Sequence, residues 1–133
     1  RNDHRGSGTS TALVAWGASA SATASADSSV EYDGASWTAG GTNVFNYGRG
    51  GHAGSQSAAF AFCPYNPPQT DTSRYDGTSW STMPKLSTTR GNSAAGFGTS
   101  TSSAIIEGGK PSTAVEEFTG ETTALNIESV DNS

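Results

Sequence analysis

The stretch YDGASW at Tyr32–Trp37 recurs as YDGTSW at Tyr75–Trp80, 43 residues further along the chain. The same step leads to Phe118 and Gly120, in a third copy that lacks both the aspartate and the tryptophan. Asp-Gly favours a hairpin turn, because glycine accepts a positive φ and aspartate tolerates one. We therefore expect each copy to join two antiparallel strands. The positions that define the repeat are Tyr32, Asp33, Gly34, Trp37, Tyr75, Asp76, Gly77, Trp80, Phe118 and Gly120.

A second feature recurs in the same order. A run of small residues leads into an apolar segment some twenty residues before each aromatic position, at Gly8–Gly17, Gly54–Cys63 and Gly98–Gly109. Repeats of about 40–50 residues with short strands are typical of β-propeller blades. We expect three units, at 1–40, 41–83 and 84–127, with a tail at 128–133. Closed propellers usually have four or more blades, so we expect other chains or a longer parent protein to complete the ring, or the units to stack as an open β assembly.

Each unit is predicted to contain four strands and no helix, because no apolar period of 3.6 residues occurs. Trp37 and Trp80 are expected in the core, since large rings bury well between blades. The predicted first strands lie around His4–Gly8, Val44–Gly48 and Arg90–Phe97, and the second at Ala12–Trp16, Ala58–Phe62 and Ser103–Glu107. The predicted third strands are Ser29–Asp33, Thr72–Asp76 and Ala114–Phe118, and the fourth Ser36–Ala39, Ser79–Thr82 and Thr122–Ile127.

The composition excludes several classes of partner. The 133 residues carry a net charge of −5 with only seven Lys and Arg, which argues against nucleic acid and against anionic membrane surfaces. A single cysteine excludes an intrachain disulfide. The longest apolar run, Ala12–Trp16, is too short to span a bilayer.

The segment Arg74–Arg90, followed by Ser103–Phe118, resembles the kelch repeat. That repeat has an apolar strand ending in diglycine, then an acidic-aromatic strand, a tryptophan, Met-Pro and an arginine. The matching residues are Ile105-Ile106, Gly108-Gly109, Glu117-Phe118, Trp80, Met83-Pro84 and Arg90. The resemblance implies an all-β fold of kelch-like propeller blades. Kelch propellers include both binding modules and enzymes, so the fold alone does not define a function.

The Tyr-Asp-Gly-x-Ser-Trp phrase, together with GSQSAAFAF at Gly54–Phe62, is similar to repeat arrays in uncharacterised proteins of marine bacteriophages. Those proteins look like virion appendages or fibres. The resemblance implies a location on the virion surface or outside the cell. It also implies other virion proteins, or further copies of this chain, as partners.

Three short sequence patterns resemble catalytic or ligand-binding motifs, but we interpret each as serving the fold. Gly48–Ala53 has the form of a dinucleotide fingerprint, but the residues that follow have a strand pattern, so we interpret its glycines as relieving crowding near a propeller axis. Asp76-Gly77 is near a sialidase Asp-box but lacks the intervening residue, and we interpret it as a turn. Neighbouring Glu116 and Glu117 point to opposite faces of a strand, and we expect a solvated edge there.

No copper site of the galactose oxidase type is matched by Cys63, His4 or His52. We expect Cys63 to be a small buried hydrophobe at a strand end. We expect each histidine to lie in a loop or strand rather than to bind metal. The sequence predicts no cofactor, no metal and no enzymatic activity.

The loop Cys63–Thr72 offers Tyr65, Asn66 and Gln69 on a proline-stiffened insertion, where an aromatic face and amides can bind sugar. The sequence predicts a non-enzymatic structural protein of a phage virion, assembling through strand edges and blade faces. The alternative is a carbohydrate-binding module that recognises a host surface glycan through this loop.

Overall fold

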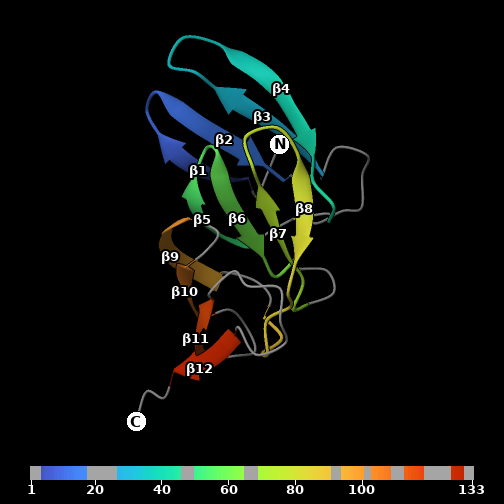
Figure 1. The fold of residues 1–133 in the computed structure, drawn as a ribbon, viewed down its shortest axis with the longest axis vertical. Helices are drawn as coiled ribbons and strands as arrows, with labels where there is room; N and C mark the ends of the chain where they lie inside the picture. Colours follow the sequence, from blue (N-terminus) through green and yellow to red (C-terminus); the bar gives the residue numbers. More distant parts are fainter. Residues whose placement is uncertain are drawn as a thin grey trace.

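The computed structural model describes residues 4–17, 27–45, 50–64, 69–90, 94–100, 103–108, 113–118 and 127–130. These residues form three four-stranded antiparallel sheets and no helix, which confirms the expected all-β class. Figure 1 shows the sheets following one another along the long axis of the molecule, from the N-terminal sheet to the C-terminal sheet. In the first and second sheets, sequence order is also spatial order, and the third sheet has the order β12-β11-β10-β9. All three sheets are therefore meanders with the same connectivity.

The first sheet contains β1 (Arg5–Thr9), β2 (Ala12–Trp16), β3 (Ser28–Tyr32) and β4 (Trp37–Thr42). The second contains β5 (Gly51–Ser55), β6 (Ala58–Phe62), β7 (Thr72–Tyr75) and β8 (Trp80–Met83). The third contains β9 (Ala94–Ser100), β10 (Ser103–Gly108), β11 (Val115–Phe118) and β12 (Ile127–Val130).

The second and third strands of every unit lie where the sequence predicted them, because apolar runs and the aromatic-Asp-Gly turn mark them clearly. The first strand of the second unit lies later than the predicted Val44–Gly48, of which residues 46–48 lie outside the described residues. Asn43 donates its backbone N–H to the Asp27 carbonyl at 2.7 Å and so prolongs the end of the first sheet, and the strand begins instead at Gly51. The predicted strand Thr122–Ile127 lies outside the described residues except for Ile127, which pairs with Phe118 and begins β12.

The Asp-Gly hairpin turns form as expected in the first two sheets. Asp33 Oδ1 accepts the backbone N–H groups of Ala35 and Ser36 at 2.9 and 2.8 Å. In the turn between β7 and β8, Asp76 Oδ1 accepts those of Thr78 and Ser79, both at 2.9 Å. Gly34 and Gly77 have φ angles of 97° and 96°. The motif therefore encodes the same turn in both copies.

The core lies between the sheets and follows the two-residue alternation of β-strands. Ala59 and Ala61 of β6 join Tyr75 and Trp80 in a cluster with Val14 and Trp16 of the first sheet. The alternate residues Phe60 and Phe62 join Met83 in a cluster with Ile106 and Phe118 of the third sheet. The second sheet is thus buried on both faces. The face with Ala59, Ala61, Tyr75 and Trp80 packs on the first sheet, and the face with Phe60, Phe62 and Met83 packs on the third.

Candidate functional site

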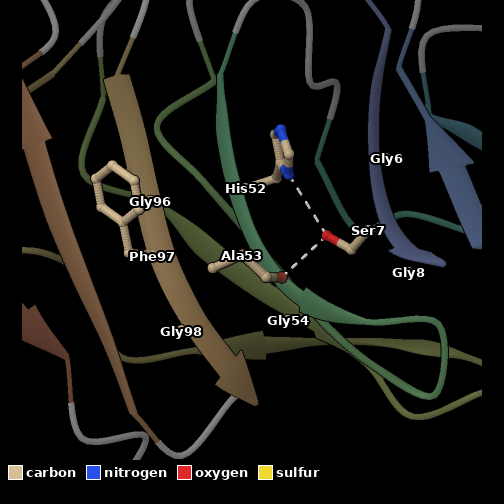
Figure 2. Close-up of a pocket in the computed structure, with 9 residues that line it drawn as sticks. All are labelled: Gly6, Ser7, Gly8, His52, Ala53, Gly54, Gly96, Phe97 and Gly98. Carbon is tan, nitrogen blue, oxygen red and sulfur yellow. Dashed lines mark hydrogen bonds between the residues drawn. The ribbon is translucent and has the colours of Figure 1, made fainter.

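A pocket of about 340 Å³ lies where the inner strands of the three sheets meet (Figure 2). Each of β1, β5 and β9 contributes three consecutive residues to it. The strand positions correspond between repeats, and the last residue of each set, Gly8, Gly54 or Gly98, has a positive φ. The residues that line the pocket are Gly6, Ser7 and Gly8, then His52, Ala53 and Gly54, then Gly96, Phe97 and Gly98.

Glycines allow the inner strands to approach closely. A Cβ at Gly51 would lie 2.0 Å from the Phe62 ring, and a Cβ at Gly96 would lie 2.6 Å from the His52 carbonyl oxygen. Gly51 therefore leaves room for the Phe62 ring of the neighbouring strand, and the expected propeller axis stays a prediction. A strand, β5, follows this glycine, whereas the dinucleotide fingerprint requires a helix.

The polar groups of the pocket are Ser7 and His52, which point toward one another in Figure 2. Ser7 Oγ donates to the Ala53 carbonyl at 3.0 Å and lies 3.5 Å from His52 Nδ1. Burial lowers the pKa of His52, and the charge of Arg5 lowers it further, so the imidazole is neutral at pH 7. The ring also packs edge-on against Trp16 at 6.1 Å.

This pair does not form a hydrolytic nucleophile and base. The serine proton is directed to a backbone carbonyl, whereas activation requires it to be directed to the imidazole. Among the described residues that line the pocket, none is a carboxylate that could orient the ring. What the pocket offers is a neutral imidazole, a hydroxyl, and the ring of Phe97, which is 58% exposed. These groups suit hydrogen bonding and stacking with a neutral ligand better than catalysis.

The sequence did not identify this pocket. A signal was present: Gly6-Ser7-Gly8 and Gly96-Phe97-Gly98 both place one side chain between two glycines on a first strand. Without the register of the three strands, nothing in the sequence indicates that these segments meet.

The proposed glycan loop is only partly described. Tyr65 and Asn66 lie outside the described residues, as does the repeat position Gly120. Gln69 is half-buried, and its backbone exchanges hydrogen bonds of 3.1 and 3.2 Å with Arg90. Gln69 therefore joins the connection between β6 and β7 to the segment that precedes β9.

The aromatic residues of the repeat have different environments. Tyr32 and Trp37 pack together at 5.0 Å, and Tyr75 and Trp80 repeat this arrangement at 5.1 Å with the same tilt. Phe118 stacks on Phe60 at 4.4 Å. Trp80 is in the core, as predicted, but the prediction for Trp37 is wrong, because its side chain is 55% exposed. The difference is that the first sheet covers Trp80, whereas none of the three described sheets lies over Trp37.

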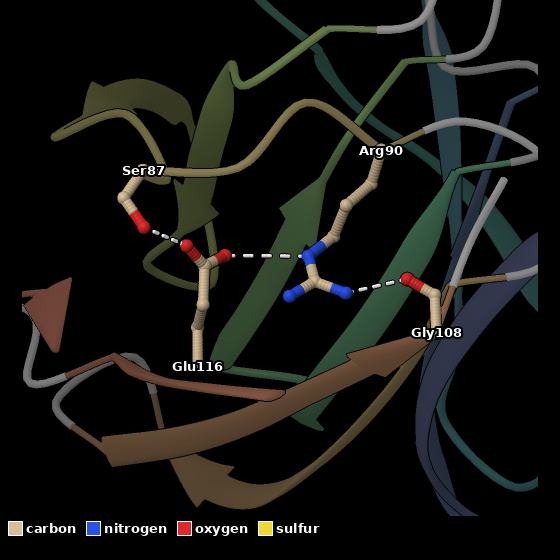
Figure 3. Close-up of polar contacts among 4 residues, drawn as sticks. All are labelled: Ser87, Arg90, Gly108 and Glu116. Carbon is tan, nitrogen blue, oxygen red and sulfur yellow. Dashed lines mark hydrogen bonds and ion pairs between the residues drawn. The ribbon is translucent and has the colours of Figure 1, made fainter. Parts of the chain in front are cut away.

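Glu116 is also a correction to the sequence analysis. It is fully buried rather than part of a solvated edge, and Arg90 Nε donates to its carboxylate at 3.2 Å (Figure 3). The Ser87 hydroxyl donates to the same carboxylate, and the Arg90 guanidinium also donates to the Gly108 carbonyl. Glu117 is exposed, so the two neighbours do point to opposite faces. The network joins the segment after β8 to β10 and β11 and has a structural role.

Cys63 is buried directly after β6, as predicted. Burial raises the pKa of its thiol to about 12, so it is not a thiolate nucleophile at neutral pH. Among the residues that the structure describes, no three histidine, cysteine or acidic side chains gather as metal ligands do. Within the same part of the chain, no helix is long and apolar enough to cross a membrane.

No protein-family model matches this sequence, and no curated protein matches it.

Proposed function

We propose that this chain is a non-enzymatic structural protein whose sheets are kelch-like propeller blades and whose role is to assemble with other β-sheets. The observation that carries this proposal is the pocket, which is lined by the same three strand positions from each repeat. Equivalent strands meet in this way when blades surround a common axis. Three blades fill part of such a ring, and the remainder requires further sheets.

The proposed setting is the surface of a phage virion, as an appendage, fibre or decoration protein. The sequence resemblance to phage repeat arrays supports it. The chemistry of the pocket also favours a structural role, because the Ser7–His52 contact lacks the geometry of a catalytic pair.

Light scattering on the purified chain at two concentrations tests the assembly. The expected mass is a multiple of 13.5 kDa that rises or holds with concentration. A mass of 13.5 kDa at every concentration, with no partner from the virion, would contradict the proposal.

A second candidate function is carbohydrate binding, at the pocket rather than only at the loop of Gln69. The exposed ring of Phe97 and the His52 imidazole, which are both among the residues that line the pocket, support it, since sugars stack on aromatic faces and hydrogen-bond to neutral polar groups. A glycan array tests it. Binding that disappears in Phe97→Ala, with an unchanged circular dichroism spectrum, would support this function over the first.

A further inference from the structure

The outer face of the first sheet, the face turned away from the second sheet, is apolar. Strand pairing places Leu13, Tyr32 and Trp37 side by side on it, with Ala15 and Val30 beside them. None of the five is buried, and Trp37 is more than half exposed. A sheet with one face in water alternates apolar and polar residues. The first sheet carries apolar residues on both faces, a pattern typical of a sheet with a neighbour on each side.

The second sheet shows what such a face binds. Its equivalent positions are Ala59, Ala61, Ser73, Tyr75 and Trp80, and all five are buried against the first sheet. Trp80 packs on Trp16 at 5.0 Å, and its indole N–H donates to Ser29 Oγ at 3.2 Å.

The Tyr75 hydroxyl makes the defining polar contact of this junction. It donates to the Glu31 carboxylate of the first sheet. Tyr32 occupies the same repeat position in the first sheet. It would find the same kind of acceptor if the sheet opposite carried an acid at the position of Glu31.

The third sheet presents such an acid. Phe118 corresponds to Tyr75 and Tyr32, so Glu117 corresponds to Glu31. Glu116 and Phe118, on either side of Glu117, are buried toward the second sheet. Glu117 is exposed on the opposite face. The two end faces of the stack thus carry the donor and the acceptor of the junction that already joins the first two sheets.

We propose that the Leu13–Tyr32–Trp37 face of one chain binds the third sheet of a second copy, with the Tyr32 hydroxyl donating to Glu117 of that copy. This inference rests on the proposed assembly function and specifies its contact. The contact is head-to-tail, so it generates a ring if the rotation closes and a filament if it does not. Two copies would give six sheets, which is within the range of closed propellers.

Sedimentation velocity across a range of protein concentrations tests the apolar part of the contact. Trp37→Ala is expected to weaken self-association by about thirtyfold or more, because a central tryptophan dominates such interfaces. Val44→Ala is the control, since it truncates another exposed apolar side chain that lies outside β2, β3 and β4. It is expected to leave association unchanged. Circular dichroism spectra are recorded for both variants to check that each one is folded.

The polar part of the contact is tested by a double-mutant cycle. Tyr32→Phe removes the donor and Glu117→Leu removes the acceptor of the same hydrogen bond, and each is expected to weaken association by about tenfold to a hundredfold. The double variant is expected to be no weaker than the single variants, because the bond can be lost only once.

The outcomes separate this inference from the proposed function. Self-association that is unchanged by Trp37→Ala would overturn the contact and leave the assembly function standing. Additive losses in the cycle would overturn the Tyr32–Glu117 pairing. A wild-type chain that stays monomeric and binds a glycan would overturn both.

Discussion

Cys63 holds a backbone conformation that glycine holds in the other two repeats. Its φ is 59°, whereas the equivalent Gly17 and Gly108 have φ angles of 82° and 65°. A residue with a Cβ loses about 1–2 kcal/mol in this left-handed region relative to the right-handed one. The turn after the second strand of each repeat therefore demands a glycine, and the second repeat tolerates a cysteine because its side chain is buried in the core.

This strain predicts an unusual order of stabilities for two substitutions. Cys63→Gly and Cys63→Ala both remove the thiol, but only alanine keeps the strained Cβ. We expect Cys63→Gly to be the more stable of the two by about 1 kcal/mol, although glycine ordinarily costs more chain entropy than alanine. Urea unfolding of both variants measures the difference, and a more stable alanine variant would contradict the prediction.

Asp33 and Asp76 make the stability of the two hairpin turns depend on pH. The backbone N–H groups of Ser36 and Ala35 lower the pKa of Asp33 below 3.8, and those of Ser79 and Thr78 do the same for Asp76. A carboxylate whose pKa is lower in the folded state stabilises that state above its unfolded pKa. The contribution is therefore complete above pH 3.8 and is lost as the pH falls through the folded pKa values.

The double variant Asp33→Asn, Asp76→Asn is expected to lose less stability than the wild type when the pH falls below 3.8. Asparagine keeps an acceptor oxygen for the turn but does not titrate. Urea midpoints measured from pH 6 to pH 2 check this, and parallel pH profiles for the two proteins would argue against it.

At the scale of the strand, the Arg90–Glu116 pair stabilises the junction between the second and third sheets only as a complete unit. Both side chains are fully buried, and Arg90 Nη2 has no hydrogen-bond partner among the described residues. Removing one member of a buried ion pair leaves an uncompensated charge, which costs about 3–5 kcal/mol. Replacing both members by apolar groups avoids that cost.

We therefore expect Glu116→Gln to lower the free energy of unfolding by about 3–5 kcal/mol. The double variant Arg90→Met, Glu116→Leu is expected to lose less than this single substitution. Chemical denaturation gives both values, with Glu117→Gln as the control at an exposed neighbour on the same strand. A double variant less stable than Glu116→Gln would show that the hydrogen bonds to Ser87 and Gly108 outweigh the charge.

The strands that could be predicted from sequence are those with a local signal. The apolar run of β6 and the Tyr-Asp-Gly turn after β7 specify their own conformation, and both lie where they were expected. The start of β5 could not be predicted, because Gly51–Ser55 has no apolar alternation and is a strand only through its pairing with β6. The pocket was missed for the same reason, since it depends on the mutual positions of three strands.

Across the whole molecule, burial of the repeated tryptophan depends on what lies opposite. Trp37 and Trp80 share one local sequence and one local geometry, with a tyrosine ring at nearly the same distance. Only Trp80 has a neighbouring sheet over it, with 7% of its side chain exposed. No property of the motif itself could have distinguished them.

The close approach of β5 and β9 gives a prediction at the same scale. The atoms nearest to an alanine Cβ at Gly51 would all belong to the Phe62 ring, whereas those nearest to an alanine Cβ at Gly96 would include the His52 carbonyl oxygen. Each substitution is expected to cost about 1–3 kcal/mol through overpacking. Phe62→Leu is expected to recover most of the loss from Gly51→Ala and less of the loss from Gly96→Ala. Thermal unfolding of the four variants checks this, and equal recovery would contradict it.

The two faces of the second sheet bury different side chains, with Ala59, Ala61, Tyr75 and Trp80 on one face and Phe60, Phe62 and Met83 on the other. A single unit therefore contains both halves of the junction that it forms with its neighbours. Tandem duplication of one 43-residue segment would therefore add both packing faces of a new sheet in the same event. A gene that encodes such units can lengthen or shorten without inventing an interface, and selection then acts on the number of units rather than on each contact.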